Sequence, residues 1–103
     1  MYLRISPDAP VTVHEADDCG RLHVTLDGAT EEQADTALRS AALGRIDGPD
    51  EAWLDLAGLR ALAEGAATAD DWAAQWDKMI AYARSKGWAT PDGTEVQAHI
   101  ERA

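Results

Sequence analysis

The sequence predicts an α+β fold, a two-layer sandwich with helices on one face of a mostly antiparallel sheet. Five short segments alternate apolar and polar residues with the period of a strand, and three longer ones place apolar residues at helical spacing. Turn-forming proline, glycine and aspartate separate these segments. The expected order is β-β-β-α-β-α-α-β, which leaves one sheet face uncovered.

Residues 2–5, 11–15 and 21–26 are the first three predicted strands. Prolines interrupt the chain between the first and second strands because proline removes a backbone donor. The turn-like residues 16–20 predict a hairpin between the second and third strands. In this hairpin Val13 opposes either Leu22 or Val24. These two registers differ by an even number of residues, so both place His14 and His23 on the same face of the sheet.

The first predicted helix begins after Thr30, which forms a capping box with Gln33. The pattern extends to about residue 43, and Gly44 is expected to end the helix. Its apolar stripe consists mainly of alanines, which allow a helix to lie close to a sheet.

Residues 50–64 have two interpretations. A strand over 52–56 followed by a helix over 57–64 agrees with the alternation of Leu54 and Leu56 with Trp53. A single helix running from Pro49 to residue 64 also fits, because proline is common at the first helical position. We favour the strand, which would place Trp53 on the same face as the histidines.

The last predicted helix is expected to begin at Thr68, with Asp71 three residues later in a capping position. Apolar residues then recur at helical spacing and predict the face that packs on the core, namely Trp72, Trp76, Met79, Ile80 and Ala83. This helix is expected to be the main packing helix of the domain.

Gly87 is expected to end this helix, with Trp88 folding back over its last turn in a Schellman-type cap. Alternatively, Tyr82 and Trp88 edge a pocket between this helix and the last strand. A turn over residues 90–93 precedes that strand, which is predicted over 95–101.

Length and charge limit the classes of function. The 103 residues form one domain, residues 1–103, because two cores of half this size would leave too much surface in water. Nine Lys and Arg against 19 Asp and Glu give a net charge of −10, which disfavours nucleic acid and anionic membranes and suits a basic protein partner. The chain shows no membrane span or secretion signal, so we expect a cytoplasmic protein. The absence of Phe and Asn, with abundant Ala, is typical of a GC-rich bacterial genome.

The residues most suited to chemistry carry no recognisable catalytic or metal motif. His14, His23 and His99 share the polar parity of their strands but lack the spacing of a zinc site, so no metal or cofactor is expected. The single cysteine, Cys19, directly follows Asp17 and Asp18. The negative charges of these aspartates should raise the pKa of the Cys19 thiol and make it a poor nucleophile. No GxSxG or phosphate-binding loop is present, so an enzyme is not favoured.

These observations predict a small acidic cytoplasmic protein-binding module of the inhibitor, immunity or accessory type. Its partner would be a basic protein or a second copy in a homodimer. The alternative is a small enzyme or ligand-binding domain with a histidine-lined pocket on the sheet or at a dimer seam. The candidate binding face is the uncovered side of the sheet, which gathers Tyr2, Arg4, His14, Arg21, His23, Trp53, His99 and Glu101.

Overall fold

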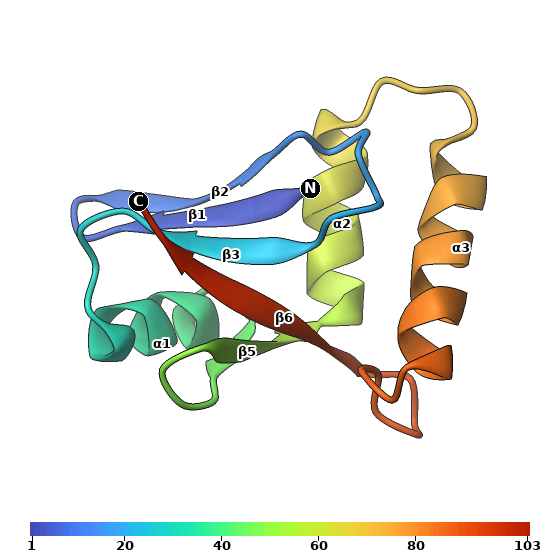
Figure 1. Ribbon diagram of the computed structural model, residues 1–103. Coiled ribbons are helices and arrows are strands. Elements are labelled where there is room, and N and C mark those ends of the chain that lie inside the picture. Colours follow the sequence, from blue (N-terminus) through green and yellow to red (C-terminus); the bar gives the residue numbers. More distant parts are fainter.

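Six strands form one sheet in the order β2-β1-β3-β6-β5-β4 in the computed structural model, which describes residues 1–103 (Figure 1). The strands are β1 (Tyr2–Ser6), β2 (Ala9–His14), β3 (His23–Leu26), β4 (Gly44–Ile46), β5 (Glu51–Asp55) and β6 (Glu95–Arg102). The helices are α1 (Glu31–Ser40), α2 (Leu56–Ala66) and α3 (Trp72–Ser85). The α+β class is confirmed, but the sheet is mixed: β1 pairs parallel with β3 and β3 parallel with β6, while the other three pairings are antiparallel.

The predicted hairpin between the second and third strands is wrong, because β1 lies between β2 and β3. β1 is antiparallel to β2 and parallel to β3. Only residues 7 and 8 separate β1 from β2, and so short a link favours a hairpin between those two strands. The side chains of Leu3 and Ile5 are 0% and 1% exposed, so β1 gains most from an internal position in the sheet.

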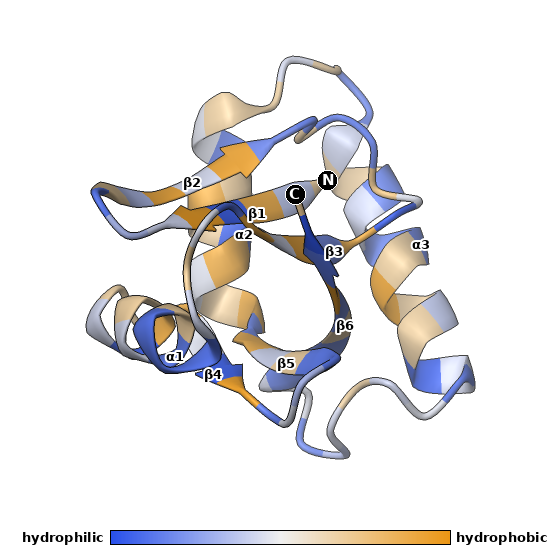
Figure 2. Ribbon diagram, turned by 60° about the vertical axis from the view of Figure 1, so that its left-hand side comes forward, coloured by the Kyte–Doolittle hydropathy of each residue, from blue (hydrophilic) through white to orange (hydrophobic).

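The sheet curls into a half-barrel, and α1 and α2 lie on its inner side (Figure 2). α1 contacts β4 at one end of the strand order and β1 and β2 at the other, while α2 contacts β2 and β5. The two helices therefore bridge the halves of the curled sheet and enclose the core between them. Buried strand residues that face this core include Leu3, Ile5, Val24, Leu26, Ala52, Leu54, Val96, Ala98 and Ile100. The expected placement of helices on one face holds for α1 and α2, whereas α3 stands at one end of the sheet (Figure 1).

The start of α1 agrees with the prediction, and its end does not. The Thr30 side chain accepts from the backbone of Gln33, and the Gln33 side chain accepts from the backbone of Thr30, which is the expected capping box. The helix ends at residue 40, and Gly44 belongs to the short strand β4. Gly44 has φ +144°, and an added Cβ would lie 2.1 Å from the carbonyl oxygen of Trp53, so only glycine fits against β5 there. A three-residue strand carries too little alternation to be predicted.

Residues 50–64 form a strand and a helix, as favoured, and not one continuous helix. β5 covers 51–55 and α2 covers 56–66. The Asp55 carboxylate caps α2 by accepting from the Gly58 backbone N–H at 2.8 Å.

No helix in the chain combines the length and apolar character needed to cross a lipid bilayer.

The N-terminal end of α3 is attached to the loop that follows β2. One oxygen of the Asp17 carboxylate accepts from the backbone N–H groups of Thr68 and Ala69 at 2.8 and 2.9 Å, and the other accepts from the Thr68 hydroxyl at 2.7 Å. The Trp72 indole donates to the Ala16 carbonyl at 2.7 Å, where it is buried. Two independent sets of hydrogen bonds therefore fix this end of the helix.

Thr68 is not the N-terminal cap that the sequence predicts. α3 begins at Trp72, with Asp71 at the cap position and no side-chain hydrogen bond closing it. The Thr68 hydroxyl is engaged by Asp17 instead, so a contact distant in sequence has displaced the local one.

The C-terminal end of α3 is attached to β6. The Gly87 N–H donates to the Arg84 carbonyl at 3.1 Å and the Trp88 N–H to the Ala83 carbonyl at 2.9 Å, which confirms the Schellman-type cap. The Trp88 carbonyl then accepts from the Gln97 N–H at 2.6 Å. α3 is thus held at both ends.

Leu59→Ala should lower the free energy of unfolding by about 2–5 kcal/mol, because Leu59 is fully buried on α2 where it fills the half-barrel. Chemical denaturation followed by circular dichroism measures this. Leu62→Ala, on the same helix but only half-buried, is the matched control and should cost clearly less. Equal losses would contradict the placement of α2.

Asp17→Ala should lower the melting temperature at neutral pH, and the difference from the wild type should shrink in acid. The hydrogen bonds from Ala69 and Thr68 hold the pKa of Asp17 below its usual value. A lowered folded-state pKa stabilises the fold above the unfolded value of about 3.9, and this contribution is lost as the pH falls through the folded-state pKa. Melting curves of both proteins between neutral and acidic pH test this. A constant difference would show that the loss does not come from the carboxylate.

Candidate functional site

Four aromatic side chains form a line across the outer face of the sheet, the face opposite α1 and α2. The strand registers place Tyr2 beside both His14 and His23, and His23 beside His99. We call these four residues the ring row. The predicted common face of the three histidines is confirmed, although the predicted hairpin is not. Inserting β1 changes which residues are neighbours, but the pairing keeps the alternation of each strand in phase.

The first three rings of the row are stacked. The Tyr2 ring lies 5.1 Å from the His14 ring and 4.9 Å from the His23 ring, with interplanar angles of 13° and 17°. These three side chains are half-buried by one another, whereas His99 on β6 is exposed. Because the phenol is held on both sides, the stack presents a preordered aromatic surface instead of three separate mobile side chains.

Polar contacts hold the two outer rings of the stack. The Thr12 hydroxyl lies 2.8 Å from Nε2 of His14. Nδ1 of His23 donates to the Arg21 carbonyl at 3.2 Å, and Nε2 lies 3.4 Å from the Glu101 carboxylate. When His23 is protonated, both of its nitrogens can donate to these acceptors. Glu101, which lies on the same strand as His99, thus contacts the histidine of the neighbouring strand.

The remaining predicted residues lie around the row at different distances from it. Arg4 occupies the next position along β1 on the same face and forms an ion pair with Asp27. The Trp53 register partner is Gln97, which confirms that Trp53 faces the same side of the sheet as the histidines. Arg21 precedes β3 and reaches the row only through its backbone carbonyl. The candidate face is therefore one continuous surface for most, but not all, of the residues assigned to it.

The sequence alone missed two features of this surface. Glu51 lies beside His99 on the neighbouring strand β5 and extends the row by one position. The Arg45 guanidinium lies 5.8 Å from the Trp53 ring and pairs with Glu95. Both depend on the antiparallel pairing of β5, which joins segments far apart in the chain and leaves no local pattern.

Four hollows of the surface lie beside α3, between α2 and α3, beside α1 and near β4, and residues other than His14, His23 and His99 line them. No group of three or more His, Cys, Asp or Glu side chains is arranged to hold a metal ion. The outer face consequently offers a broad surface of rings and charges, a shape suited to contact with another surface.

A double-mutant cycle should detect the stack directly. Replacing Tyr2 and His14 by leucine, singly and together, should give a coupling energy of about 0.5–1.5 kcal/mol, because stacked rings contribute beyond the area they bury. Denaturant unfolding of the four proteins measures it. The same cycle with Tyr2 and His99, which are not adjacent in the row, is the control and should give a coupling near zero. Equal couplings would argue against stacking.

Contacts on the outer face thus preorder three rings and neutralise Arg4 and Arg45, while Glu51 and Glu101 remain at the border of the ring row. These side chains come from strands that are distant in sequence and adjacent in the sheet. No family model, curated protein or solved structure gives a significant match to this chain.

Proposed function

We propose that the protein is a binding module that recognises a basic protein through the ring row and its neighbours on the outer face. The observation that carries this proposal is the preordered stack of His14, Tyr2 and His23 on a face that neither α1 nor α2 covers. Aromatic rings that are already fixed lose little conformational freedom on binding, so they act as efficient anchors. A cytoplasmic inhibitor, immunity or accessory protein would use such a surface.

Charge supports a basic partner. The chain carries a net charge of −10, and two arginines of the outer face, Arg4 and Arg45, are already paired with acidic side chains. Glu51 and Glu101 border the row, and the Glu101 side chain, although it contacts His23, is 58% exposed, so both can meet cations of a partner. Opposite charges accelerate association and favour the correct partner over others.

A second copy of the chain is the competing occupant of this face. Two chains with this net charge repel each other, which disfavours self-association at low ionic strength. The outer face also combines the ring row with acidic residues, and a face of this kind would have to place like charges against one another in many symmetric arrangements. We therefore favour a different, basic protein.

Reversing the charges that border the row should abolish partner binding. The wild type and the variant Glu51→Lys with Glu101→Lys are used as baits in extracts of the protein's own cells, and captured proteins are quantified by mass spectrometry. A partner specific to the wild type is then purified, and its affinity for each bait is measured by calorimetry. We expect the variant to bind at least about tenfold more weakly, because it loses two attractive contacts and gains two repulsive ones.

The matched control is Glu64→Lys with Asp70→Lys, which makes the same change in net charge on exposed residues of α2 and the loop after it. This control should retain binding. Equal weakening by both variants would show that only overall charge matters, and equal binding by both would exclude the outer face. Sedimentation at micromolar concentration should give the mass of one chain, 11.1 kDa. If the wild type instead has twice this mass and the variant Glu51→Lys with Glu101→Lys has the mass of one chain, the occupant of the outer face is a second copy and not a basic partner.

A further inference from the structure

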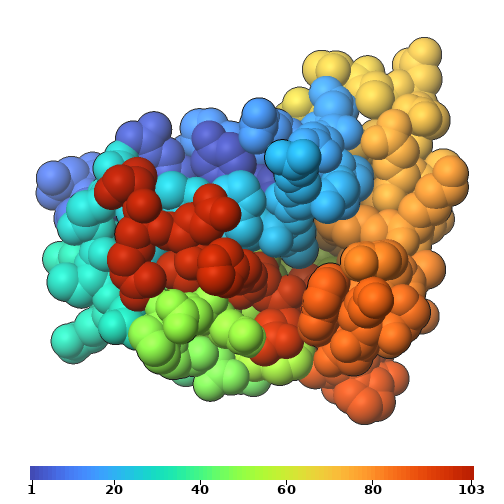
Figure 3. Space-filling view, in the orientation of Figure 1, coloured from blue at the N-terminus to red at the C-terminus, as the bar shows by residue number.

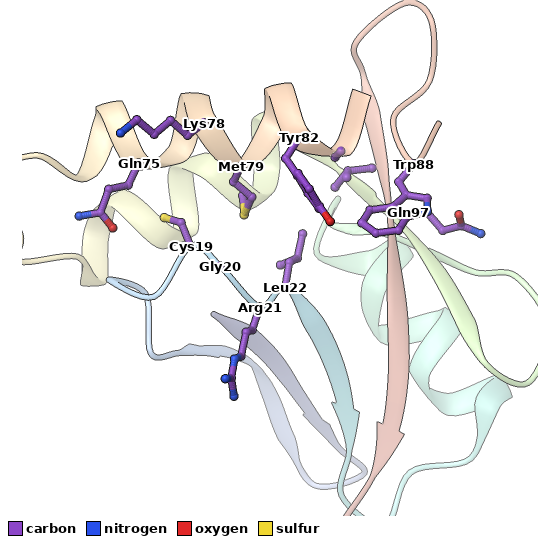
Figure 4. A pocket seen from close by; sticks show the side chains of 12 residues that line it. Cys19, Gly20, Arg21, Leu22, Gln75, Lys78, Met79, Tyr82, Trp88 and Gln97 are labelled. Carbon is purple, nitrogen blue, oxygen red and sulfur yellow. The ribbon is translucent and has the colours of Figure 1, made fainter. Parts of the chain in front are cut away.

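A second surface, separate from the ring row, lies between α3 and the start of β6. α3 is attached at its N-terminal end through Asp17 and Trp72 and at its C-terminal end through Trp88. Between these attachments the structure contains a cleft of about 510 Å³, which we call the α3 cleft (Figure 4). Small molecules commonly bind in hollows of about 300–1,000 Å³.

Apolar side chains form the walls of the α3 cleft. Met79 and Tyr82 extend from α3 toward Leu22, and Trp88 closes one end (Figure 4). Ala83 and Val96 complete the apolar lining. The sequence-based alternative for Tyr82 and Trp88, a pocket between the last helix and the last strand, is thus confirmed as a geometric feature.

The α3 cleft holds the two large apolar side chains that are most exposed in the protein. Tyr82 is 57% exposed and Trp88 is 43% exposed, and no other large apolar side chain is exposed. Their ring centres lie 5.7 Å apart with an interplanar angle of 69°. Two rings set edge to face leave flat apolar surfaces open to a third ring. Exposed apolar surface gathered in a hollow is typical of a binding site, in contrast to single exposed residues spread over a surface.

The charges around the α3 cleft differ from those of the chain as a whole. Lys78 and Arg21 line it, and Nζ of Lys86 lies 5.6 Å from the centre of the Tyr82 ring. None of these three takes part in an ion pair, although four arginines elsewhere do: Arg4, Arg39, Arg45 and Arg60. In a chain with only nine Lys and Arg against 19 acidic residues, this grouping favours an anionic ligand.

The two ends of the α3 cleft are not equivalent. At the end near Cys19, burial raises the pKa of the thiol, and the charges of Asp18, Asp17 and Asp71 add to this while the N-terminal ammonium group opposes it. At the other end, Nζ of Lys86 lies over the exposed Tyr82 ring, so an anion that contacts this ring meets a cation there. Figure 4 shows the Arg21 side chain extending away from the cleft and the Lys78 side chain lying along α3 toward Gln75. Lys86 is therefore the cation closest to the exposed rings, and the flexible Lys78 side chain, which also lines the cleft, is the second cation on the same helix.

We propose that the α3 cleft binds a small, flat aromatic carboxylate. Its ring lies against Tyr82, Trp88 and Met79, and its carboxylate lies at the rim where Lys78 and Lys86 can reach it. A protein side chain inserted from a partner and a neutral apolar molecule are the alternatives that an experiment has to distinguish from this ligand.

Titration of the isotopically labelled protein with sodium 2-naphthoate, followed by amide and indole NMR signals, tests this proposal. We expect saturable shifts of the Trp88 indole and of the Leu22 and Met79 amides, with a Kd of about 0.1–1 mM. The uncharged analogue 2-naphthalenemethanol should bind about tenfold more weakly, because it lacks the charge that the lysines recognise. Equal binding of the two compounds would overturn the anionic class, and shifts centred on His99 would overturn the site.

Variants separate the charge from the rings. Lys78→Gln with Lys86→Gln should weaken naphthoate binding about tenfold, whereas Arg39→Gln with Arg60→Gln, which makes the same change in net charge on α1 and α2, should leave it unchanged. Tyr82→Leu keeps an apolar side chain at an exposed position and should also weaken binding. Absence of saturable shifts in the folded wild type would overturn the proposal. So would shifts of the same amides that depend on protein concentration without naphthoate, because a second copy would then occupy the α3 cleft.

Discussion

The position of β1 at the interior of the sheet determines most of the structure. β1 is a five-residue strand whose inward side chains, Leu3 and Ile5, are fully buried. Placing it between β2 and β3 requires one antiparallel and one parallel pairing, and the parallel pairing of β3 with β6 continues the mixed sheet. A parallel neighbour needs a longer connection than a hairpin, which the loop over residues 15–22 supplies. That same loop then reaches across to hold the start of α3.

The outer face and the α3 cleft both follow from this arrangement. With β1 in the interior, Tyr2 stands between His14 and His23, which the predicted hairpin would have placed on one face without a strand between them. With the loop after β2 extended, Asp17 and Ala16 lie where the chain between α2 and α3 passes, and α3 is held away from the middle of the sheet. The pairing of β1 with β2 and β3 thus leads to two surfaces with different chemistry. One consists of stacked polar rings, and the other has apolar walls with cations at the rim.

Local sequence patterns predicted the elements better than their partners. The Thr30 capping box, the strand before α2, the Gly87 termination and the final strand are each indicated by a pattern within a few consecutive residues, and all agree with the structure. The parity of the histidines also survived, since alternation does not depend on which strands pair. The strand order could not be predicted, because burial of β1 competes with the hairpin signal at residues 16–20 through contacts distant in sequence. The Thr68 prediction was wrong for the same reason, as Asp17 is fifty-one residues away in the chain.

The two borders of the sheet are poorly suited to pairing with a strand from another chain. β4 offers only three residues at one border, and β2 carries Pro10, which has no N–H to donate, at the other. A strand from another chain would find few free backbone groups at either border, which limits both polymerisation of the sheet and its extension by a partner peptide. The proposed recognition therefore depends on side chains that point away from the sheet, and these can be substituted without disturbing the backbone hydrogen bonds that hold the strands together.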